Sequence, residues 1–411
     1  MGIKTVHGRT IFNSRGQETI ECIVTLDSGK QGVASVPSGL SVSSHEACQM
    51  PASVSCTQAL QLLKTKISPL LVGKQADVVT VDALLLHLDD TEHKEKLGAQ
   101  LMLAISMAVA RAQALESDID LYELIAYLCS FDTVILPLPF FNFISGGMHA
   151  RNGLSIQEFL VVPCGAKNFR QAMEITHDLH QKAKKMLTKK KLSTATSDEG
   201  AFADAFHDDK KALDFLVELL ESCEFGSLFK LAIDVAATRL YDPKRKLYVW
   251  GKQELQAHEM IDFYSHLIST YPICSIEDGL HENDWVGWQK MTERLGQFVQ
   301  ITGDDFLATN PQRIYEAGER SAANGVIIKP NQIGTVTETL QAVQVCKEYG
   351  LGTMVSHRSG ETNDTFIADL AVGSSAGQIK AGGFSHGERM AKYNRLLEIE
   401  ENLTLLALEE R

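Results

Sequence analysis

The sequence lacks the features that mark secreted, membrane-spanning and nucleic-acid-binding proteins. Its first residues, MGIKTVHGRTIF, contain no long apolar stretch, so we expect no signal peptide. The most apolar segment, residues 101–115, is interrupted by Ser106 and Arg111 and is too short to cross a bilayer. Acidic residues outnumber basic ones, 52 to 39, and the net charge of −13 argues against nucleic acid and anionic membranes as partners. We therefore expect a cytoplasmic protein.

Several motifs of cofactor binding and nucleophilic catalysis are also missing. The eight cysteines include no C-x-x-C pair, which favours free thiols in a reducing compartment. There is no Walker loop and no dinucleotide-binding fingerprint. The G-x-S-x-G pattern at residues 373–377 follows a helical rather than a strand pattern, so we expect no nucleophile elbow there. The segment HEMID (258–262) lacks the second histidine of a zinc-protease helix.

Two kinds of hydrophobic periodicity divide the chain. Residues 9–36 alternate as strands do and residues 57–130 follow a helical period, which predicts an N-terminal α+β domain over 1–134. From residue 135 onward, short apolar runs alternate with amphipathic helical stretches at intervals of mostly about 25 residues. Such a repeat is typical of a parallel sheet with helices between its strands. We expect an α/β fold in which residues 135–411 form a (β/α)8-type, TIM-like barrel.

The apolar runs of this second region each end in an ionisable residue. In a (β/α) barrel the carboxyl ends of the strands converge on one face, where active sites lie. The side chains expected to meet there are Asp234, Glu277, Asp304, Lys329, His357 and Lys380.

Three of these side chains, Asp234, Glu277 and Asp304, are carboxylates from successive runs. Together they would repel one another and raise one another's pKa unless a cation lay between them. Ligands that are all oxygen favour Mg²⁺, or Mn²⁺, over zinc. A helix cap or a loop salt bridge would explain any one acid alone, but three at corresponding strand ends favour a metal site.

Lysines complete a chemical pattern on the same face. A lysine beside a dication has its ammonium form disfavoured, so the pKa of Lys329 or Lys380 is expected to fall towards the range of a general base. Lys329 closes the run GVII immediately before Pro330, which favours an extended backbone at the lysine. Glu199, in the loop segment SDEG, would serve as an acid if burial raised its pKa. Metal, amine and carboxylic acid together indicate proton abstraction next to a carboxylate.

A series of motifs resembles the enolases, the hydro-lyases that dehydrate 2-phosphoglycerate. In chain order the motifs are SGGMHARNGLSIQEF (145–159), SDEG (197–200), SIED (275–278), GDDFLATNPQRI (303–314), IIKPNQIGTVTET (327–339), SHRSGET (356–362) and AKYNRLLEIEE (391–401). The resemblance implies the enolase fold, an N-terminal domain that caps a catalytic barrel. It also implies a place in glycolysis and gluconeogenesis, two Mg²⁺ sites, a small phosphorylated carboxylate as substrate, and a homodimer or a multiple of dimers.

The resemblance further implies a role for each matched residue. The first Mg²⁺ would be held by Asp234, Glu277 and Asp304, and the second by Ser41. Lys329 would abstract the C2 proton and Glu199 would assist the loss of hydroxide from C3. The remaining catalytic residues would be Glu158, His357 and Lys380. The substrate would be bound by His149, Gln157, Arg358, Ser359 and Lys380, with Arg358 and Ser359 suited to phosphate.

The loop around Ser41 departs from the enolase pattern. Leu40, Val42 and Ser43 replace Ala, Thr and Gly, and an acidic R-D-G-D turn is absent. Loss of the glycine stiffens the hinge that a closing lid requires. Two alternatives therefore stay open beside 2-phosphoglycerate dehydration. One is an enolase-like enzyme of a specialised pathway that acts on a phosphonate analogue, for example one that forms carboxyphosphonoenolpyruvate. The other is a non-catalytic, enolase-like binding protein.

Overall fold

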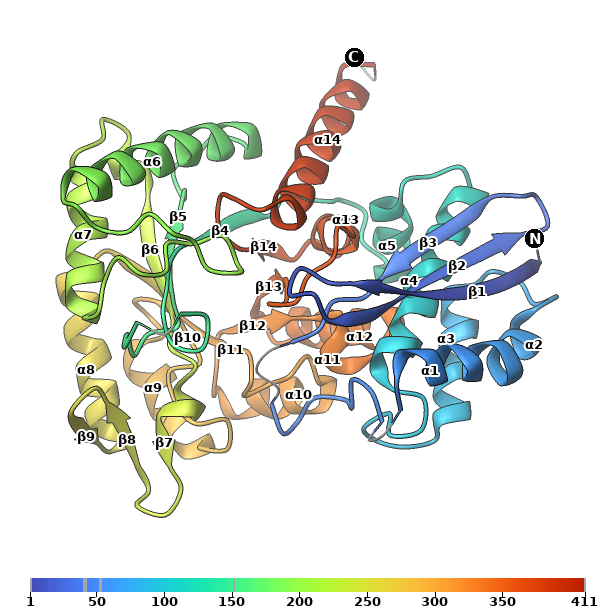
Figure 1. Ribbon diagram of the computed structural model, residues 1–411, viewed down its shortest axis with the longest axis horizontal. Coiled ribbons are helices and arrows are strands. Elements are labelled where there is room, and N and C mark those ends of the chain that lie inside the picture. The colour runs from blue at the N-terminus through green and yellow to red at the C-terminus, as the bar shows by residue number, and fades with distance from the viewer. Residues whose placement is uncertain (1, 40–42, 52–53, 151, 410–411) are drawn as a thin grey trace.

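The computed structural model describes residues 2–39, 43–51, 54–150 and 152–409. The chain begins with an antiparallel sheet of β1 (Ile3–Phe12), β2 (Glu18–Leu26) and β3 (Gln31–Ser35), followed by helices (Figure 1). These helices are α1 (Cys56–Leu62), α2 (Ser68–Leu71), α3 (Val78–Asp89), α4 (Ala99–Glu116) and α5 (Leu121–Cys129), with a π-helical turn, Leu63–Ile67, between α1 and α2. No helix in the described ranges is long and apolar enough to span a membrane.

The N-terminal sheet is built on strict alternation. Ile20, Cys22, Val24 and Leu26 of β2 are fully buried, as every second residue of a strand with one covered face should be. This face packs against α4, which crosses behind the sheet in Figure 1. Gly32 of β3 permits the close approach, because a Cβ there would lie 2.0 Å from the carbonyl oxygen of Ala108 in α4.

The rest of the chain forms a closed eight-stranded barrel surrounded by helices. Its strands, in order around the barrel, are β4 (Leu138–Ser145), β5 (Glu158–Val162), β6 (Lys230–Asp234), β10 (Ile273–Glu277), β11 (Gln300–Gly303), β12 (Gly325–Ile328), β13 (Gly352–Ser356) and β14 (Gly377–Lys380). The helices are α6 (Phe169–Lys189), α7 (Asp209–Glu221), α8 (Ala257–Thr270), α9 (Trp285–Leu295), α10 (Pro311–Arg320), α11 (Pro330–Ile333), α12 (Val336–Glu348), α13 (Phe366–Gly373) and α14 (Gly387–Glu409). A small sheet of β7 (Tyr241–Asp242), β8 (Leu247–Trp250) and β9 (Gln253–Leu255) precedes α8. The predicted fold class, a barrel preceded by an α+β domain, is confirmed.

One strand corrects the expectation of a wholly parallel sheet. β5 runs antiparallel to both β4 and β6, whereas the other neighbouring pairs are parallel. The reason is the connection: the described residues of 146–157 form no crossover helix, and only antiparallel strands can be joined without one. Because β5 is reversed, its first residue, Glu158, lies at the end of the barrel where β4 and β6 finish. Glu158 pairs there with Ser145 and with Asp234.

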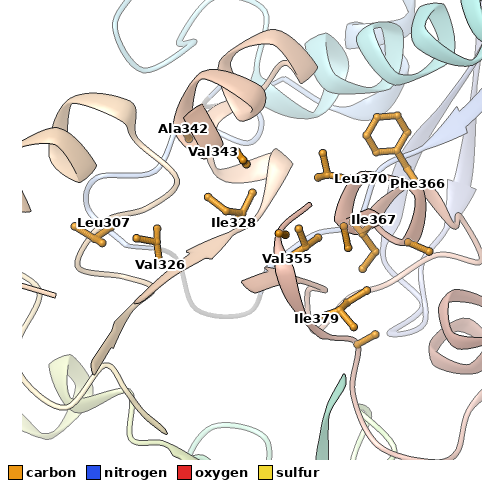
Figure 2. Close-up of a cluster of buried hydrophobic side chains, with 14 of the residues drawn as sticks. Leu307, Val326, Ile328, Ala342, Val343, Val355, Phe366, Ile367, Leu370 and Ile379 are labelled. Carbon is orange, nitrogen blue, oxygen red and sulfur yellow. The ribbon is translucent and has the colours of Figure 1, made fainter. Parts of the chain in front are cut away.

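Residues of the parallel strands alternate between the barrel interior and the surrounding helices. Figure 2 shows Val326 and Ile328 of β12 and Val355 of β13 on the side that faces α12 and α13. The intervening residues fill the interior, where Ile327 and Met354 belong to a separate cluster. The other members of that cluster are Phe140, Leu160, Val162 and Ala232. This alternation, continued by one residue beyond Ile328, turns Lys329 towards the barrel axis.

The N-terminal domain is fastened to the loop that follows β13. Arg111 of α4 donates two hydrogen bonds to Asp364, at 2.7 and 2.8 Å, and the backbone N–H of Ser35 donates to the same carboxylate at 2.9 Å. Ser38 and Gly360 exchange two backbone hydrogen bonds of 2.8 and 2.9 Å. These contacts bring the N-terminal domain to the carboxyl ends of the barrel strands.

Candidate active site

A buried ammonium group lies among three carboxylates at the mouth of the barrel. The Nζ atom of Lys380 is 2.8 and 2.9 Å from the two carboxylate oxygens of Glu277 and 3.0 Å from Oε2 of Glu158. Oδ2 of Asp234 lies 3.4 Å from the same nitrogen. All four side chains are at most 5% exposed. The structure thus brings together four of the residues predicted from the ends of the apolar runs and from the motif around Glu158.

Lys329 and Asp304 form a second ion pair on adjoining strand ends. Nζ of Lys329 contacts Oδ2 of Asp304, and Nε2 of Gln332 donates to Oδ1 of Asp304 at 3.0 Å. The backbone of Lys329 is extended (φ −127°, ψ 105°), and Pro330 begins α11 directly after it. Burial is the largest single influence and lowers the pKa of Lys329, but the charges of Asp304 and Glu277 oppose it and the net direction is upward. The sequence analysis expected a lowered pKa for Lys329 because it placed a divalent cation beside the amine. Among the protein's own side chains, the group beside the amine is the carboxylate of Asp304.

The three carboxylates predicted as metal ligands fit a hard divalent cation by their chemistry. They come from the adjacent strands β6, β10 and β11, and Asp234 and Glu277 are register partners. Burial raises the pKa of Asp234, and burial together with Asp234 raises that of Glu277 well above its usual range. Such groups stay ionised only beside positive charge, and in the chain alone Lys380 supplies it. Buried, all-oxygen donors that need a cation are what Mg²⁺ binds.

Within the described residues, two groups of side chains have ligand atoms within 4.8 Å of one another, and the predicted trio Asp234, Glu277 and Asp304 is not one of them. The two groups are His149 with Glu158 and Glu199, and Asp278 with Asp304 and Asp305. Asp278 has an evident structural role, because its two oxygens accept the backbone N–H groups of Asp304 and Asp305 at 2.9 and 2.8 Å. Asp278 thereby shapes the turn that presents Asp304, a contribution that the sequence did not reveal.

Two carboxyl groups and a histidine lie together next to Lys380: Glu158, Glu199 and His149. Nδ1 of His149 is 3.5 Å from Oε1 of Glu199, and the carboxyl groups of Glu158 and Glu199 are hydrogen-bonded to each other. Burial lowers the pKa of His149, but Glu199 and Asp198 raise it more, to about 9. Burial raises the pKa of Glu158. Burial acts in the same direction at Glu199, but the charge of His149, the hydrogen bond with Glu158 and the charge of Arg389 together make the net direction downward. The proton shared by the two carboxyls therefore resides on Glu158, although the sequence analysis looked for it on Glu199.

The segment after β13 carries a neutral histidine. Burial, and then the charge of Arg389, hold the pKa of His357 well below its usual value. Nη1 of Arg389 donates to Nδ1 of His357 at 2.6 Å, so the ring proton is on Nε2. Arg389 also donates to the carbonyl oxygens of Arg358 and Ser359 at 2.6 and 2.7 Å. This fully buried arginine from α14 positions the whole segment, and helical periodicity alone could not distinguish it from a surface residue.

The side chain of Arg358 is held by two groups that the sequence analysis did not name. Its Nη1 and Nη2 atoms donate to the two carboxylate oxygens of Glu46, each at 3.1 Å, and Nη1 also lies 3.3 Å from Oδ1 of Asn331. Glu46 comes from the loop between β3 and α1 and is the only acidic residue of positions 36–51. The sequence thus shows an isolated acidic residue in this loop, but it does not show which residue pairs with it.

The remaining predicted residues are placed as follows. The backbone N–H of Gln157 donates to the carbonyl oxygen of Asp234 at 2.9 Å, and its Oε1 is buried with no hydrogen-bond donor among the described residues. The carbonyl oxygen of Ser359 accepts from Arg389 and, at 3.3 Å, from Ser14. Ser41, predicted as a ligand of the second Mg²⁺, lies outside the described residues.

Paired lysines and carboxylates at the mouth of a capped α/β barrel place this chain among the α/β barrel proteins whose candidate active site lies at the carboxyl ends of the strands. Comparison with family models is more specific. Residues 133–408 match the model described as "Enolase, C-terminal TIM barrel domain", and residues 3–125 match "Enolase, N-terminal domain". The chain belongs to the enolase family, as the series of motifs predicted. The exact domain boundary at residues 134 and 135 remains a prediction.

Proposed function

We propose that this protein is a Mg²⁺-dependent hydro-lyase that dehydrates 2-phospho-D-glycerate to phosphoenolpyruvate, in glycolysis or gluconeogenesis. One observation carries the proposal: the barrel mouth brings two lysines, two hydrogen-bonded carboxyl groups and an arginine together around a set of buried carboxylates. The base would be Lys329, the acid pair Glu158 and Glu199, and the arginine Arg358. We further propose a cytoplasmic homodimer or a multiple of dimers, which sedimentation velocity would test.

The metal would be Mg²⁺, with Mn²⁺ as a substitute, held by Asp234, Glu277 and Asp304, while Ser41 would serve a second ion. When bound, it would stabilise the negative charge that accumulates on the substrate carboxylate as the C2 proton leaves. Lys380, already hydrogen-bonded to Glu277, lies where an ammonium group would stabilise the same charge.

Lys329 would take the C2 proton as the neutral amine. Its extended backbone, fixed by Pro330 and by a 2.8 Å hydrogen bond from its N–H to Thr309, limits the positions that the amine can reach. On the acid side, the proton would start on Glu158 and pass along the hydrogen bond to Glu199. Glu199 would hand it to the departing C3 hydroxide, which leaves as water, while Glu158 is left ionised.

Five residues would hold the substrate, namely Arg358, Ser359, His149, Gln157 and Lys380. Arg358 presents two N–H groups to a carboxylate in the chain alone, and the same fork suits a phosphate. His357 is neutral, with its proton on Nε2, and can therefore donate a hydrogen bond without adding charge.

The test is phosphoenolpyruvate absorbance on purified protein with 2-phosphoglycerate and Mg²⁺, with Lys329→Ala as the inactive control. Turnover that requires Mg²⁺ supports the proposal. A folded, Mg²⁺-binding protein that gives no turnover would contradict it.

The segment at Ser43 leaves one alternative substrate class open. This residue replaces the glycine of the enolase pattern, and its hydroxyl donates to Oε2 of Glu282 at 2.6 Å. A differently fastened loop is compatible with a phosphonate analogue as substrate, so the same assay should be run with such an analogue. A non-catalytic binding role is disfavoured, because every described acid, base and metal-ligand position is retained.

A further inference from the structure

Glu46 holds Arg358 in the way that a bound anion would. The two side chains make two parallel hydrogen bonds of 3.1 Å, and only 1% of Glu46 and 4% of Arg358 is exposed. Bidentate contact of this kind is the arrangement in which arginine binds carboxylate and phosphate groups. Nε2 of Gln332 adds a third donor to Oε1 of Glu46 at 3.3 Å.

The segment that carries Glu46 is fastened to the barrel on both sides of it. The hydroxyl of Ser43 donates to Oε2 of Glu282 at 2.6 Å and lies 2.8 Å from the carbonyl oxygen of Asp305. Ser44 donates to Oε1 of Glu282 at 2.8 Å, and the backbone N–H of Ala47 donates to the carbonyl oxygen of Gln332 at 2.7 Å. A glycine at position 43, as in the enolase pattern, would lack the first two of these contacts.

The charges around Arg358 explain why its guanidinium needs a partner at all times. The positive charges of Arg358 and Lys329 repel each other, while the negative charges of Asp304 and Asp305 favour the charged guanidinium. A buried guanidinium without a direct partner is strongly unfavourable. Glu46 occupies the Nη1 and Nη2 donors, so an anion that binds this edge of Arg358 must take the place of the Glu46 carboxylate.

We propose that Glu46 competes intramolecularly with the anionic group of the substrate for Arg358. The phosphate of the substrate would bind Arg358 only after the Glu46 carboxylate has moved away, and Ser43 and Ser44 would stabilise the segment in its competing position. This inference rests on the proposed function, since that function makes Arg358 the residue that binds phosphate. One consequence is that a small anion such as inorganic phosphate binds this site weakly while Glu46 is in place.

The size of the effect follows from the fraction of molecules in which Arg358 is released. A ligand that binds only the released form has its apparent Kd raised by the reciprocal of that fraction, so release in about one molecule in ten raises Kd about tenfold. Because the Glu46 carboxylate is replaced by a neutral amide in Glu46→Gln, this variant should recover most of that factor. Ser43→Gly should recover a smaller part, since it loosens the segment but keeps the carboxylate.

The experiment is calorimetric titration of the Mg²⁺-saturated, full-length protein with inorganic phosphate at constant ionic strength. Glu46→Gln should bind phosphate about tenfold more tightly than the natural protein. Glu95→Gln, which removes an exposed carboxylate elsewhere, should not change the affinity. If Glu46→Gln proves unfolded by circular dichroism, Glu46→Asp replaces it, since the shorter side chain cannot make both hydrogen bonds.

A second pair of variants tests whether the effect passes through Arg358. In an Arg358→Met background, Glu46→Gln should give no gain in phosphate affinity. A folded Glu46 variant with unchanged or weaker affinity overturns the proposal, and so does a gain that persists without Arg358. The outcome is independent of turnover: a gain in affinity without phosphoenolpyruvate formation supports the competition and rejects the proposed substrate. Turnover with no gain in the variant rejects the competition alone.

Discussion

Replacing Lys380 with methionine tests the charge balance at the barrel mouth. Methionine keeps the length of the side chain but removes the ammonium group that contacts Glu158, Asp234 and Glu277. All of these groups are buried, so water cannot replace the lost interaction. Removing one partner of a buried ion pair costs about 3–5 kcal/mol, because the other charge is left uncompensated.

This loss should appear as a lower melting temperature. In a domain of this size, 1 kcal/mol corresponds to roughly 2 °C, so Lys380→Met should melt about 6–10 °C below the natural protein at pH 8 in EDTA. Lys190→Met is the matched control. Lys190 pairs with Glu218 on the surface, where the two side chains are 41% and 53% exposed, and such a pair contributes at most about 1 kcal/mol.

The pH dependence of the loss has a definite sign. Burial already raises the pKa of Glu158, Asp234 and Glu277, and removal of Lys380 should raise these pKa values further. A carboxyl whose pKa is higher in the folded than in the unfolded protein favours folding at low pH, and this contribution is lost as the pH rises through the folded pKa. The melting deficit should therefore be smaller at pH 5 than at pH 8.

Differential scanning calorimetry at the two pH values, with EDTA and then with Mg²⁺, measures both effects. Mg²⁺ should raise the melting temperature of Lys380→Met more than that of the natural protein, because the ion supplies the missing positive charge. A variant that melts with the natural protein at pH 8, or whose deficit grows towards pH 5, would refute the electrostatic account of this cluster.

Three further changes test individual residues. Lys329→Ala should lower turnover by about 10²–10⁴-fold and abolish exchange of the substrate α-proton with solvent, seen by NMR, while Mg²⁺ still binds; persistent exchange would exclude Lys329 as the base. Asp304→Ala should weaken Mg²⁺ binding by at least about 10–100-fold, the loss that follows mutation of residues that hydrogen-bond to metal ligands. An unchanged metal titration would exclude Asp304 as a ligand. His149→Gln should melt below the natural protein at pH 6.5. That difference should vanish as the pH rises through about 9, because the raised pKa of His149 stabilises the fold only while the ring is protonated.

The sequence predicted the barrel because its strands are short apolar runs at regular spacing that end in ionisable residues. It predicted an extended backbone at Lys329 from the proline that follows, and the structure agrees. The direction of β5 could not be predicted in the same way. All five residues of EFLVV are buried, so the run has no period that distinguishes its faces, and its reversal depends on the missing crossover before it.

The partners of the predicted residues were beyond the reach of the sequence for a different reason. Glu46 and Arg358 are 312 positions apart, and Lys380 and Glu158 are 222 positions apart. Local periodicity carries no information about such contacts. The downward direction of the Glu199 pKa could not be predicted on the same ground, because the groups that oppose burial there include His149, a residue supplied by a distant loop.

These long-range pairs give the site a common design. Lys380 with Glu277, Lys329 with Asp304, and Arg358 with Glu46 are each a buried charge balanced by another part of the chain. The site therefore folds without leaving a charge uncompensated. A cation that binds the carboxylates, or an anion that binds Arg358, exchanges one ion pair for another and buries no new unpaired charge. Ligand binding at this mouth is thus an exchange of partners, and the strength of the internal pairs, as much as that of the new contacts, sets the affinity.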